Sequence, residues 1–327
     1  MRDLPLELER AAEHIATLKT KLAERYLGDS ETIDLAISAW LSGGHILIEG
    51  APGLGKTMLV RSMAQFLGLD FGRVQCTPDL MPGDITGGEV LDEIEGKKKF
   101  RFLPGPVFCH LFLADEINRA TPRTQSALLE AMEERQVTAG GRSHSLGKLF
   151  FVAATQNPIE LEGTYPLPEA QLDRFQFQLL VREPDQSTLE RILMLPEENF
   201  RERGEALFSE DDMDELFALV RQIVVPEPFV RTLAQIIRAS HPHHPEALAE
   251  VRDQVRFGAS PRAGRAILAG ARALAVMAGR AHVSPQDLNR CLAPALRHRL
   301  VLRYEARAAG SDPDALIQTL AQRFPIR

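Results

Sequence analysis

The chain of 327 residues contains little cysteine and few of the larger aromatic residues: three cysteines, one tryptophan and three tyrosines. Cys76, Cys109 and Cys291 lie far apart and form no C-x-x-C pair, so the sequence predicts neither a zinc knuckle nor a disulfide framework. Dispersed thiols are typical of proteins in a reducing compartment, and we therefore expect a cytoplasmic protein.

Long hydrophobic runs are also missing. The most apolar segment late in the chain, residues 263–279, is interrupted by Arg265 and Arg272, so we expect no insertion into a membrane. Residues 1–10 alternate charged residues with leucine and lack the apolar centre of a signal peptide, so none is expected. The formal net charge is −7, which gives no general electrostatic basis for binding nucleic acid.

Two kinds of local pattern divide the chain. In residues 1–182 short apolar runs alternate with helical patterns, which predicts an α/β domain with a parallel sheet covered on both faces. The five predicted strands are 45–49, 73–77, 111–114, 150–154 and 175–181. After residue 182 the strand signals stop, and we expect a smaller all-α domain over residues 183–327. Its predicted helices are 186–195, 211–224, 227–240, 261–279 and 285–292.

Residues 50–57 read Gly-Ala-Pro-Gly-Leu-Gly-Lys-Thr and fit G-x-x-x-x-G-K-[ST] in full, between a predicted strand and a helical stretch at 57–67. Glycines allow the backbone to wrap closely, so that its N–H groups converge on a polyphosphate. Lys56 would reach the β- and γ-phosphates, and the Thr57 hydroxyl would ligate Mg²⁺. A glycine-rich turn with a solvated lysine is the weaker alternative. The predicted ATP-binding residues are Gly50, Ala51, Pro52, Gly53, Leu54, Gly55, Lys56, Thr57, Met58 and Asp115.

Two other predicted strands end in polar residues. Asp115 and Glu116 follow the apolar run 111–114; beside a phosphate loop, Asp115 would hold Mg²⁺ through water and Glu116 would act as general base. Asn157 follows the run 150–154 and could orient the attacking water, although an Asn-Pro turn is the better explanation from the residues alone.

Further strings make the likeness to a known family specific. GAPGLGKT, LADEINRA, ATQNP and GASPRA occur in the order and spacing of AAA+ ATPases. DLMPGDITGG (79–88), FLPGPVF (102–108) and TYPLPEAQLDRF (164–175) resemble the MoxR family most closely, over nearly the whole chain from about residue 27. The resemblance implies a P-loop AAA+ module with a five-stranded parallel sheet between helices, an all-α lid, and ATP and Mg²⁺ as cofactors. It also implies assembly with itself into a ring, with a hexamer as the expected size.

The resemblance assigns roles by matching motifs. Lys56 and Thr57 match Walker A, Asp115 and Glu116 match Walker B, and Asn157 matches sensor 1. Arg174 stands where the family has its arginine finger, although a surface salt bridge is the commoner role for any one arginine. Arg262 matches sensor 2, and whether it serves its own or a neighbouring subunit is left open. The predicted catalytic residues are Glu116, Asn157, Arg174 and Arg262.

Three functions follow as hypotheses. The leading one is a ring ATPase that remodels or assembles a protein client, and the resemblance implies a client with a von Willebrand factor A domain. The alternatives are a nucleic-acid motor and a slowly hydrolysing nucleotide switch. Two predicted hairpins, 89–102 with a turn near Gly96 and 136–146 with a turn at Gly140-Gly141, have no assigned role.

Two less specific hypotheses involve histidines. His241, His243 and His244 invite a metal site, but an exposed connection between helices explains them better. Gly28 and His45 are candidates for flanking an adenine, against the alternative of a turn and a strand start.

Overall fold

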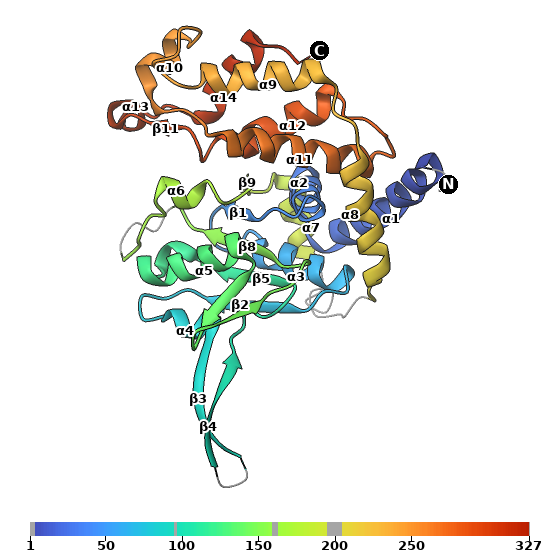
Figure 1. Cartoon of the computed structure of the whole chain (residues 1–327). Coiled ribbons are helices and arrows are strands. Elements are labelled where there is room, and N and C mark those ends of the chain that lie inside the picture. Colours follow the sequence, from blue (N-terminus) through green and yellow to red (C-terminus); the bar gives the residue numbers. More distant parts are fainter. Residues whose placement is uncertain (1–3, 95–96, 159–162, 195–204, 327) are drawn as a thin grey trace.

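A computed structural model describes residues 4–94, 97–158, 163–194 and 205–326. Figure 1 shows a helical layer with the C-terminus at the top and an α/β layer below it, from which one long hairpin projects. The elements up to the last strand of the main sheet are α1 (Leu4–Arg25), α2 (Ser30–Leu41), β1 (Ile46–Glu49), α3 (Lys56–Phe66), β2 (Phe71–Gln75), α4 (Pro82–Thr86), β3 (Gly87–Ile94), β4 (Lys97–Pro104), β5 (Leu111–Asp115), a 3-10 turn (Ile117–Arg119), α5 (Pro122–Glu134), β6 (Gln136–Ala139), β7 (Arg142–Ser145), β8 (Phe151–Gln156), α6 (Glu169–Leu172) and β9 (Phe177–Leu180).

The main sheet has five strands in the order β2-β5-β8-β1-β9, and every pairing is parallel. All five predicted strands are therefore confirmed, with ends that shift by at most a few residues. Alternate residues of β5 enter two different hydrophobic cores: Leu111 and Leu113 pack with α1 to α3, whereas Phe112 and Ala114 pack with α5. Both faces of the sheet are buried, which explains why the sequences of these strands are continuous apolar runs.

The later part of the chain is helical, so the predicted fold class is confirmed. Helix α11 packs against α12 and α2 and so joins the helical layer to the α/β layer. Among the described helices, none combines the length and apolar character that crossing a membrane requires. The elements are α7 (Gln186–Met194), α8 (Glu210–Gln222), α9 (Glu227–Ala239), α10 (Ala249–Gln254), β10 (Val255–Phe257), α11 (Pro261–Met277), α12 (Pro285–Leu296), β11 (Val301–Leu302), α13 (Tyr304–Ala308) and α14 (Pro313–Arg323).

One feature of the helical layer was not predicted. Strands β10 and β11 pair antiparallel, with Val255 opposite Leu302. They comprise three and two residues, which is too short to produce a period in the sequence.

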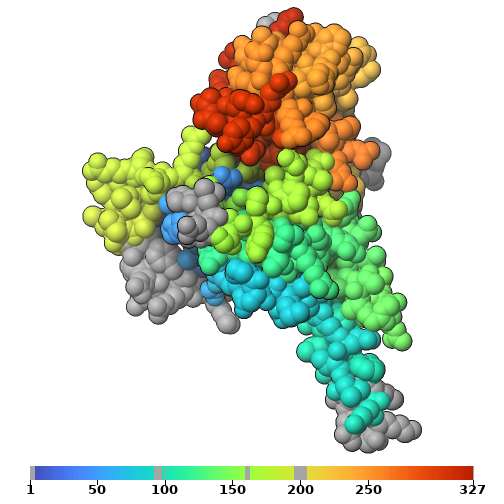
Figure 2. Space-filling model, turned by 90° about the vertical axis from the view of Figure 1, so that its left-hand side faces the viewer, coloured from blue at the N-terminus to red at the C-terminus, as the bar shows by residue number. Residues whose placement is uncertain are grey.

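Both predicted hairpins are confirmed. The β3–β4 ladder runs from the pair Gly87–Pro104 to the pair Ile94–Lys97, and the expected turn near Gly96 lies outside the described residues. Figures 1 and 2 agree that this hairpin extends away from the rest of the molecule. The β6–β7 hairpin turns at Gly140 and Gly141, whose φ angles of 57° and 73° favour glycine.

Candidate functional site: a nucleotide cleft and an arginine edge

The glycine-rich loop joins β1 to α3 and is shaped by left-handed backbone. Gly53 and Gly55 have φ angles of 82° and 76°, and Gly55 caps the N-terminus of α3. A Cβ at Gly50 would lie 2.6 Å from the carbonyl oxygen of Val181, so a larger residue would disturb the adjoining chain. The loop therefore leads directly into a helix N-terminus, where N–H groups without intrahelical partners can bind phosphate.

The ammonium group of Lys56 is held by the loop itself. Its Nζ donates to the carbonyl oxygen of Gly50 and, at 2.9 Å, to that of Ala51. Burial lowers the pKa of Lys56, whereas the carboxylates of Asp115 and Glu116 oppose this shift. A phosphate group that binds here exchanges neutral carbonyl acceptors for an anionic one, which is the stronger partner for an ammonium ion.

Asp115 is the most heavily bonded carboxylate in the cleft. Its Oδ1 accepts a 2.6 Å hydrogen bond from Thr155 Oγ1, and its Oδ2 accepts one of 3.2 Å from Thr57 Oγ1. Arg73 also donates to Oδ2, from Nε at 3.2 Å and from NH2 at 2.8 Å. Thr155 and Arg73 lie on β8 and β2, the two strands next to β5 in the sheet. Thr57 lies in the first turn of α3.

The sequence predicted Thr57 and Asp115 but missed Arg73 and Thr155. Both missed residues lie on strands that flank β5: Arg73 in the middle of β2, and Thr155 near the end of β8. Arg73 begins one predicted strand (73–77) and Thr155 follows another (150–154), but the sequence does not reveal which strands lie next to that of Asp115.

Glu116 turns away from Asp115. Its backbone is left-handed, with φ 56° and ψ 53°, and its N–H donates to Thr155 Oγ1 at 2.8 Å. Its carboxylate pairs with Arg119 NH1 at 3.0 Å. A non-glycine residue in this conformation is uncommon and is found often at functional sites. The left-handed turn separates the directions of two adjacent acids, as separate roles for them require.

The phosphate cleft has a volume of about 420 Å³. Asn157 is buried and lines it together with Lys56, Thr57, Asp115 and Glu116, so five predicted residues from three parts of the sequence meet there.

A larger pocket of about 1050 Å³ adjoins the cleft and shares Pro52 to Gly55 and Met58 with it. Tyr26, Gly28, Val181 and Pro294 contribute to its walls, and such apolar surfaces suit a nucleotide base. Gly28 lines this pocket, and its contact with an adenine stays a prediction.

His45 does not line either pocket within the described residues. Its Nδ1 accepts from the Val152 N–H at 3.0 Å, and its Nε2 faces the Met132 carbonyl oxygen at 3.2 Å. Burial lowers its pKa to about 4, so it is a neutral core residue and the adenine reading is wrong for it.

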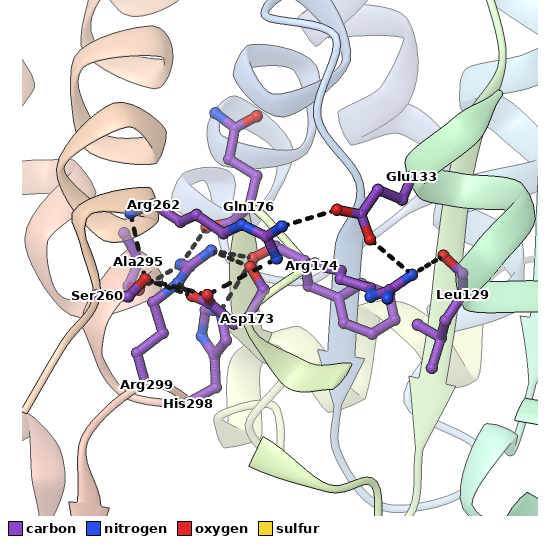
Figure 3. A network of polar contacts seen from close by, with 11 residues as sticks. Leu129, Glu133, Asp173, Arg174, Gln176, Ser260, Arg262, Ala295, His298 and Arg299 are labelled. Atoms are coloured by element: carbon purple, nitrogen blue, oxygen red, sulfur yellow. Dashed lines mark hydrogen bonds and ion pairs between the residues drawn. The ribbon is translucent and has the colours of Figure 1, made fainter. Parts of the chain in front are cut away.

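Arg174 and Arg262 lie together on a different surface, which we call the arginine edge (Figure 3). Glu133 bridges them: its Oε2 lies 2.9 Å from Arg174 NH1, and its Oε1 accepts from Arg262 NH2 at 2.7 Å. Arg174 NH1 also donates to the Leu129 carbonyl oxygen at 2.6 Å. Among the described residues that line the two pockets, neither arginine is present.

The buried guanidinium group of Arg299 anchors the segment that carries Arg174. Arg299 donates from Nε to Asp173 Oδ1 at 2.7 Å and from NH2 to the Phe175 carbonyl oxygen at 2.6 Å. Burial lowers the pKa of Arg299, and the hydrogen bond to Asp173 opposes that shift. Asp173 also accepts from Ser260 Oγ at 3.0 Å, at the start of the helix that carries Arg262. These bonds fix the chain around Arg174 against the helical layer.

The histidines after α9 are structural. His241 Nε2 faces the Ala259 carbonyl oxygen at 3.1 Å, and His244 Nε2 accepts from Arg238 Nε at 3.1 Å. In the part of the chain that the structure describes, no group of three or more His, Cys, Asp or Glu side chains could hold a metal ion.

A parallel sheet in the order β2-β5-β8-β1-β9, a phosphate-binding loop after β1 and a helical lid are the architecture of an AAA+ nucleoside triphosphatase. Comparison with known proteins agrees. Residues 45–177 match the model of the ATPase family associated with various cellular activities, and residues 248–320 match that of the AAA lid domain.

Relatives identify the family more closely. The chain is 39% identical to Chaperone MoxR1 of Mycobacterium tuberculosis over 96% of this chain and 83% of that protein. It is 33% identical to Protein MoxR of Paracoccus denitrificans over 92% of each. A crystal structure of a candidate ATPase from Cytophaga hutchinsonii superposes with a TM-score of 0.89 at 34% identity, covering 98% of this chain and 97% of that one. The chain belongs to the MoxR family of AAA+ ATPases.

Proposed function

We propose that this protein hydrolyses ATP with Mg²⁺ as one subunit of a ring and uses the reaction to remodel or assemble a protein client. One observation carries the proposal: the cleft gathers the residues that we propose bind phosphate and activate water, while Arg174 and Arg262 lie together outside it. A subunit built in this way needs a neighbour to complete its reaction centre.

The donor set of the cleft fits magnesium. Thr57 Oγ1 and Asp115 Oδ2 are hard oxygen ligands that lie 3.2 Å apart, and Mg²⁺ prefers such ligands together with phosphate and water. We propose that Thr57 ligates the ion and that Asp115 holds one of its waters. The ion would neutralise charge on the phosphates.

The remaining steps belong to side chains of this protein. Lys56 and the backbone from Gly50 to Met58 would bind the phosphates. Glu116 would take the proton of the attacking water, and the buried Asn157 would orient that water. The different partners of the two acids support this division, since Asp115 accepts from Thr57 and Thr155 whereas Glu116 pairs with Arg119.

We infer that Arg174 and Arg262 both act on the ATP of the neighbouring subunit. Glu133 holds them as a pair on one surface, which supports a shared target. The proposed assembly is a hexamer, in which each subunit offers a cleft on one side and an arginine edge on the other. We also propose that the α/β domain spans residues 1–182 and the lid residues 183–327, since β9 ends at Leu180 and α7 begins at Gln186.

The client is proposed to be a protein with a von Willebrand factor A domain. The name of the Mycobacterium tuberculosis relative describes a chaperone, which supports action on protein. The β3–β4 hairpin supports it as well: Leu91 is 56% exposed and Phe100 72% exposed, on an element that extends from the body. Leu91 and Phe100 are opposite each other in the ladder, and we propose that this exposed apolar pair contacts the client.

Capture with a hydrolysis-deficient variant tests the proposal. Glu116→Gln should hold ATP, stay assembled and retain the client, which is then identified by mass spectrometry. Wild type should release phosphate only when Mg²⁺ is present, and DNA or RNA should not stimulate it. Stimulation by nucleic acid with steep salt dependence would favour the motor hypothesis instead. A client effect that survives loss of hydrolysis would favour the switch.

A further inference from the structure

Asp115 already has a cationic partner on this chain. Arg73 extends from the middle of β2, the edge strand next to β5, and places Nε and NH2 3.2 and 2.8 Å from Asp115 Oδ2. The Arg73 side chain is 47% exposed, whereas that of Asp115 is 10% exposed. The pair therefore joins a partly exposed cation to a nearly buried carboxylate that also accepts a hydrogen bond from Thr155.

The hydrogen bonds at Asp115 leave no room for a further donor at Oδ2. That oxygen accepts from Thr57 Oγ1 and from two N–H groups of Arg73, while Oδ1 accepts from Thr155. A carboxylate offers about four acceptor positions in all, two on each oxygen. Oδ1 accepts from Thr155 alone, but Oδ2 is the oxygen that contacts Thr57, the proposed magnesium ligand. A magnesium-bound water beside Thr57 can therefore bind Oδ2 only after Arg73 has moved.

We propose that Arg73 is a positioning residue of the nucleotide site that stands in for magnesium at Asp115 and gives way when the metal binds. This inference rests on the proposed use of Mg²⁺ by the same site. Arg73 lines the phosphate cleft, so after release its guanidinium stays among the groups that face the phosphates. Gln75 accepts from Arg73 NH2 at 3.1 Å and offers a second anchor on the same strand.

The two roles of Arg73 change nucleotide affinity in opposite ways. Without the metal, its positive charge offsets Asp115 and Glu116 near the negative phosphates, so its loss should weaken binding. With the metal, Arg73 competes for Asp115, so its loss should allow magnesium to bind at lower concentration. A residue with only a structural role would move both quantities in the same direction.

Equilibrium binding of a fluorescent ADP to the full chain tests this. The affinity for the fluorescent ADP is first measured in EDTA. A titration with Mg²⁺ then gives the magnesium midpoint, which is the free Mg²⁺ concentration at which half of the change in ADP affinity has occurred. For Arg73→Gln we expect about fivefold weaker binding in EDTA and an about fivefold lower magnesium midpoint, as for the loss of one ion pair. Arg73→Lys keeps the positive charge but loses the planar guanidinium group with its several N–H donors. Its magnesium midpoint should shift in the same direction as that of Arg73→Gln, but by a smaller factor.

Arg61→Gln is the matched control, because Arg61 lines the same cleft from α3 and is not among the described partners of Asp115. Its magnesium midpoint should equal that of wild type. The inference is overturned if Arg73→Gln leaves the midpoint unchanged, if it changes both quantities by one common factor, or if Arg61→Gln gives the same shift. Should Arg73→Gln fail to fold, an unchanged midpoint in Arg73→Lys overturns it. Wild type that binds no nucleotide would instead refute the proposed function.

Discussion

The phosphate cleft and the arginine edge are both built from arginine and carboxylate side chains, yet they differ in what the carboxylate does. In the cleft, Asp115 is nearly buried and is held by Thr57, Thr155 and Arg73. At the arginine edge, Glu133 is 37% exposed and bridges Arg174 and Arg262. The first carboxylate is held in place by three partners, whereas the second pairs with two arginines at a position that water can reach.

The two carboxylates also differ in the free energy that their ion pairs contribute. Ion pairs that water can reach are worth about 0.2–1 kcal/mol, so a phosphate can replace Glu133 at little cost. Removing a partner from a nearly buried carboxylate costs several times more, because its charge stays uncompensated. One chain thus carries a firmly held carboxylate in the cleft and an exchangeable ion-pair cluster at the arginine edge, as the proposed sharing of sites between subunits requires.

Arg174→Ala should break the arginine edge and leave the cleft intact. We expect turnover to fall about 10³–10⁵-fold, the effect of losing an arginine finger, while the affinity for ATP stays within about twofold. Steady-state phosphate release and equilibrium nucleotide binding measure the two quantities separately. A parallel loss of affinity would place Arg174 in its own subunit's cleft.

Mixing variants makes the same test sharper. Subunits carrying Arg174→Ala keep the cleft, and subunits carrying Lys56→Ala keep the arginine edge. Mixed assemblies should regain part of the activity, because some interfaces then combine an intact cleft with an intact arginine. Absence of recovery would count against sites shared between subunits.

Lys56→Ala should break the cleft and leave the arginine edge intact. Two charge-assisted bonds to phosphate are worth about 1.5–3 kcal/mol each, so affinity for ATP should fall about 10²–10⁴-fold. Calorimetric titration with ATP checks this. Arg61→Gln, in the same cleft but on the following turns of α3, serves as a control that should lose much less.

Glu116→Gln should separate binding from chemistry within the cleft. The variant keeps the shape of the side chain but removes the base, so turnover should fall about 10²–10⁴-fold with affinity nearly unchanged. Single-turnover hydrolysis with prebound ATP measures the chemical step. Hydrolysis close to wild type would show that another group takes the proton.

The comparison also explains what the sequence could reveal. The loop from Gly50 to Thr57 is a contiguous motif whose geometry follows from glycine and a helix start, so its place in the fold was predictable. The meeting of Asp115 and Asn157 was predictable because parallel strands end at one edge of a sheet. Arg73 could not be assigned, since its partner depends on which strand lies beside β5.

The arginine edge was predictable only in part. Arg174 and Arg262 follow from motifs, but the residues that hold them carry no local signal. Glu133 is one of several acids on an amphipathic helix, and Arg299 is one of several arginines after α12. Their roles come from long-range packing of the lid on the sheet, which sequence periodicity does not encode.

The variant with the smallest expected effect tests most directly whether the ion pairs of the arginine edge are exchangeable. Glu133→Gln removes the charge that pairs with Arg174 and Arg262 and that, in the proposed ring, would compete for them with a neighbour's phosphate. If these pairs are exchangeable, the protomer concentration that gives half-maximal ATPase activity should fall about fivefold, which corresponds to about 1 kcal/mol. Glu130→Gln, an exposed position on the same helix, should leave that concentration unchanged. A higher concentration for Glu133→Gln, together with a lower maximal rate, would mean that Glu133 aligns the arginines for catalysis and is as fixed in its role as Asp115.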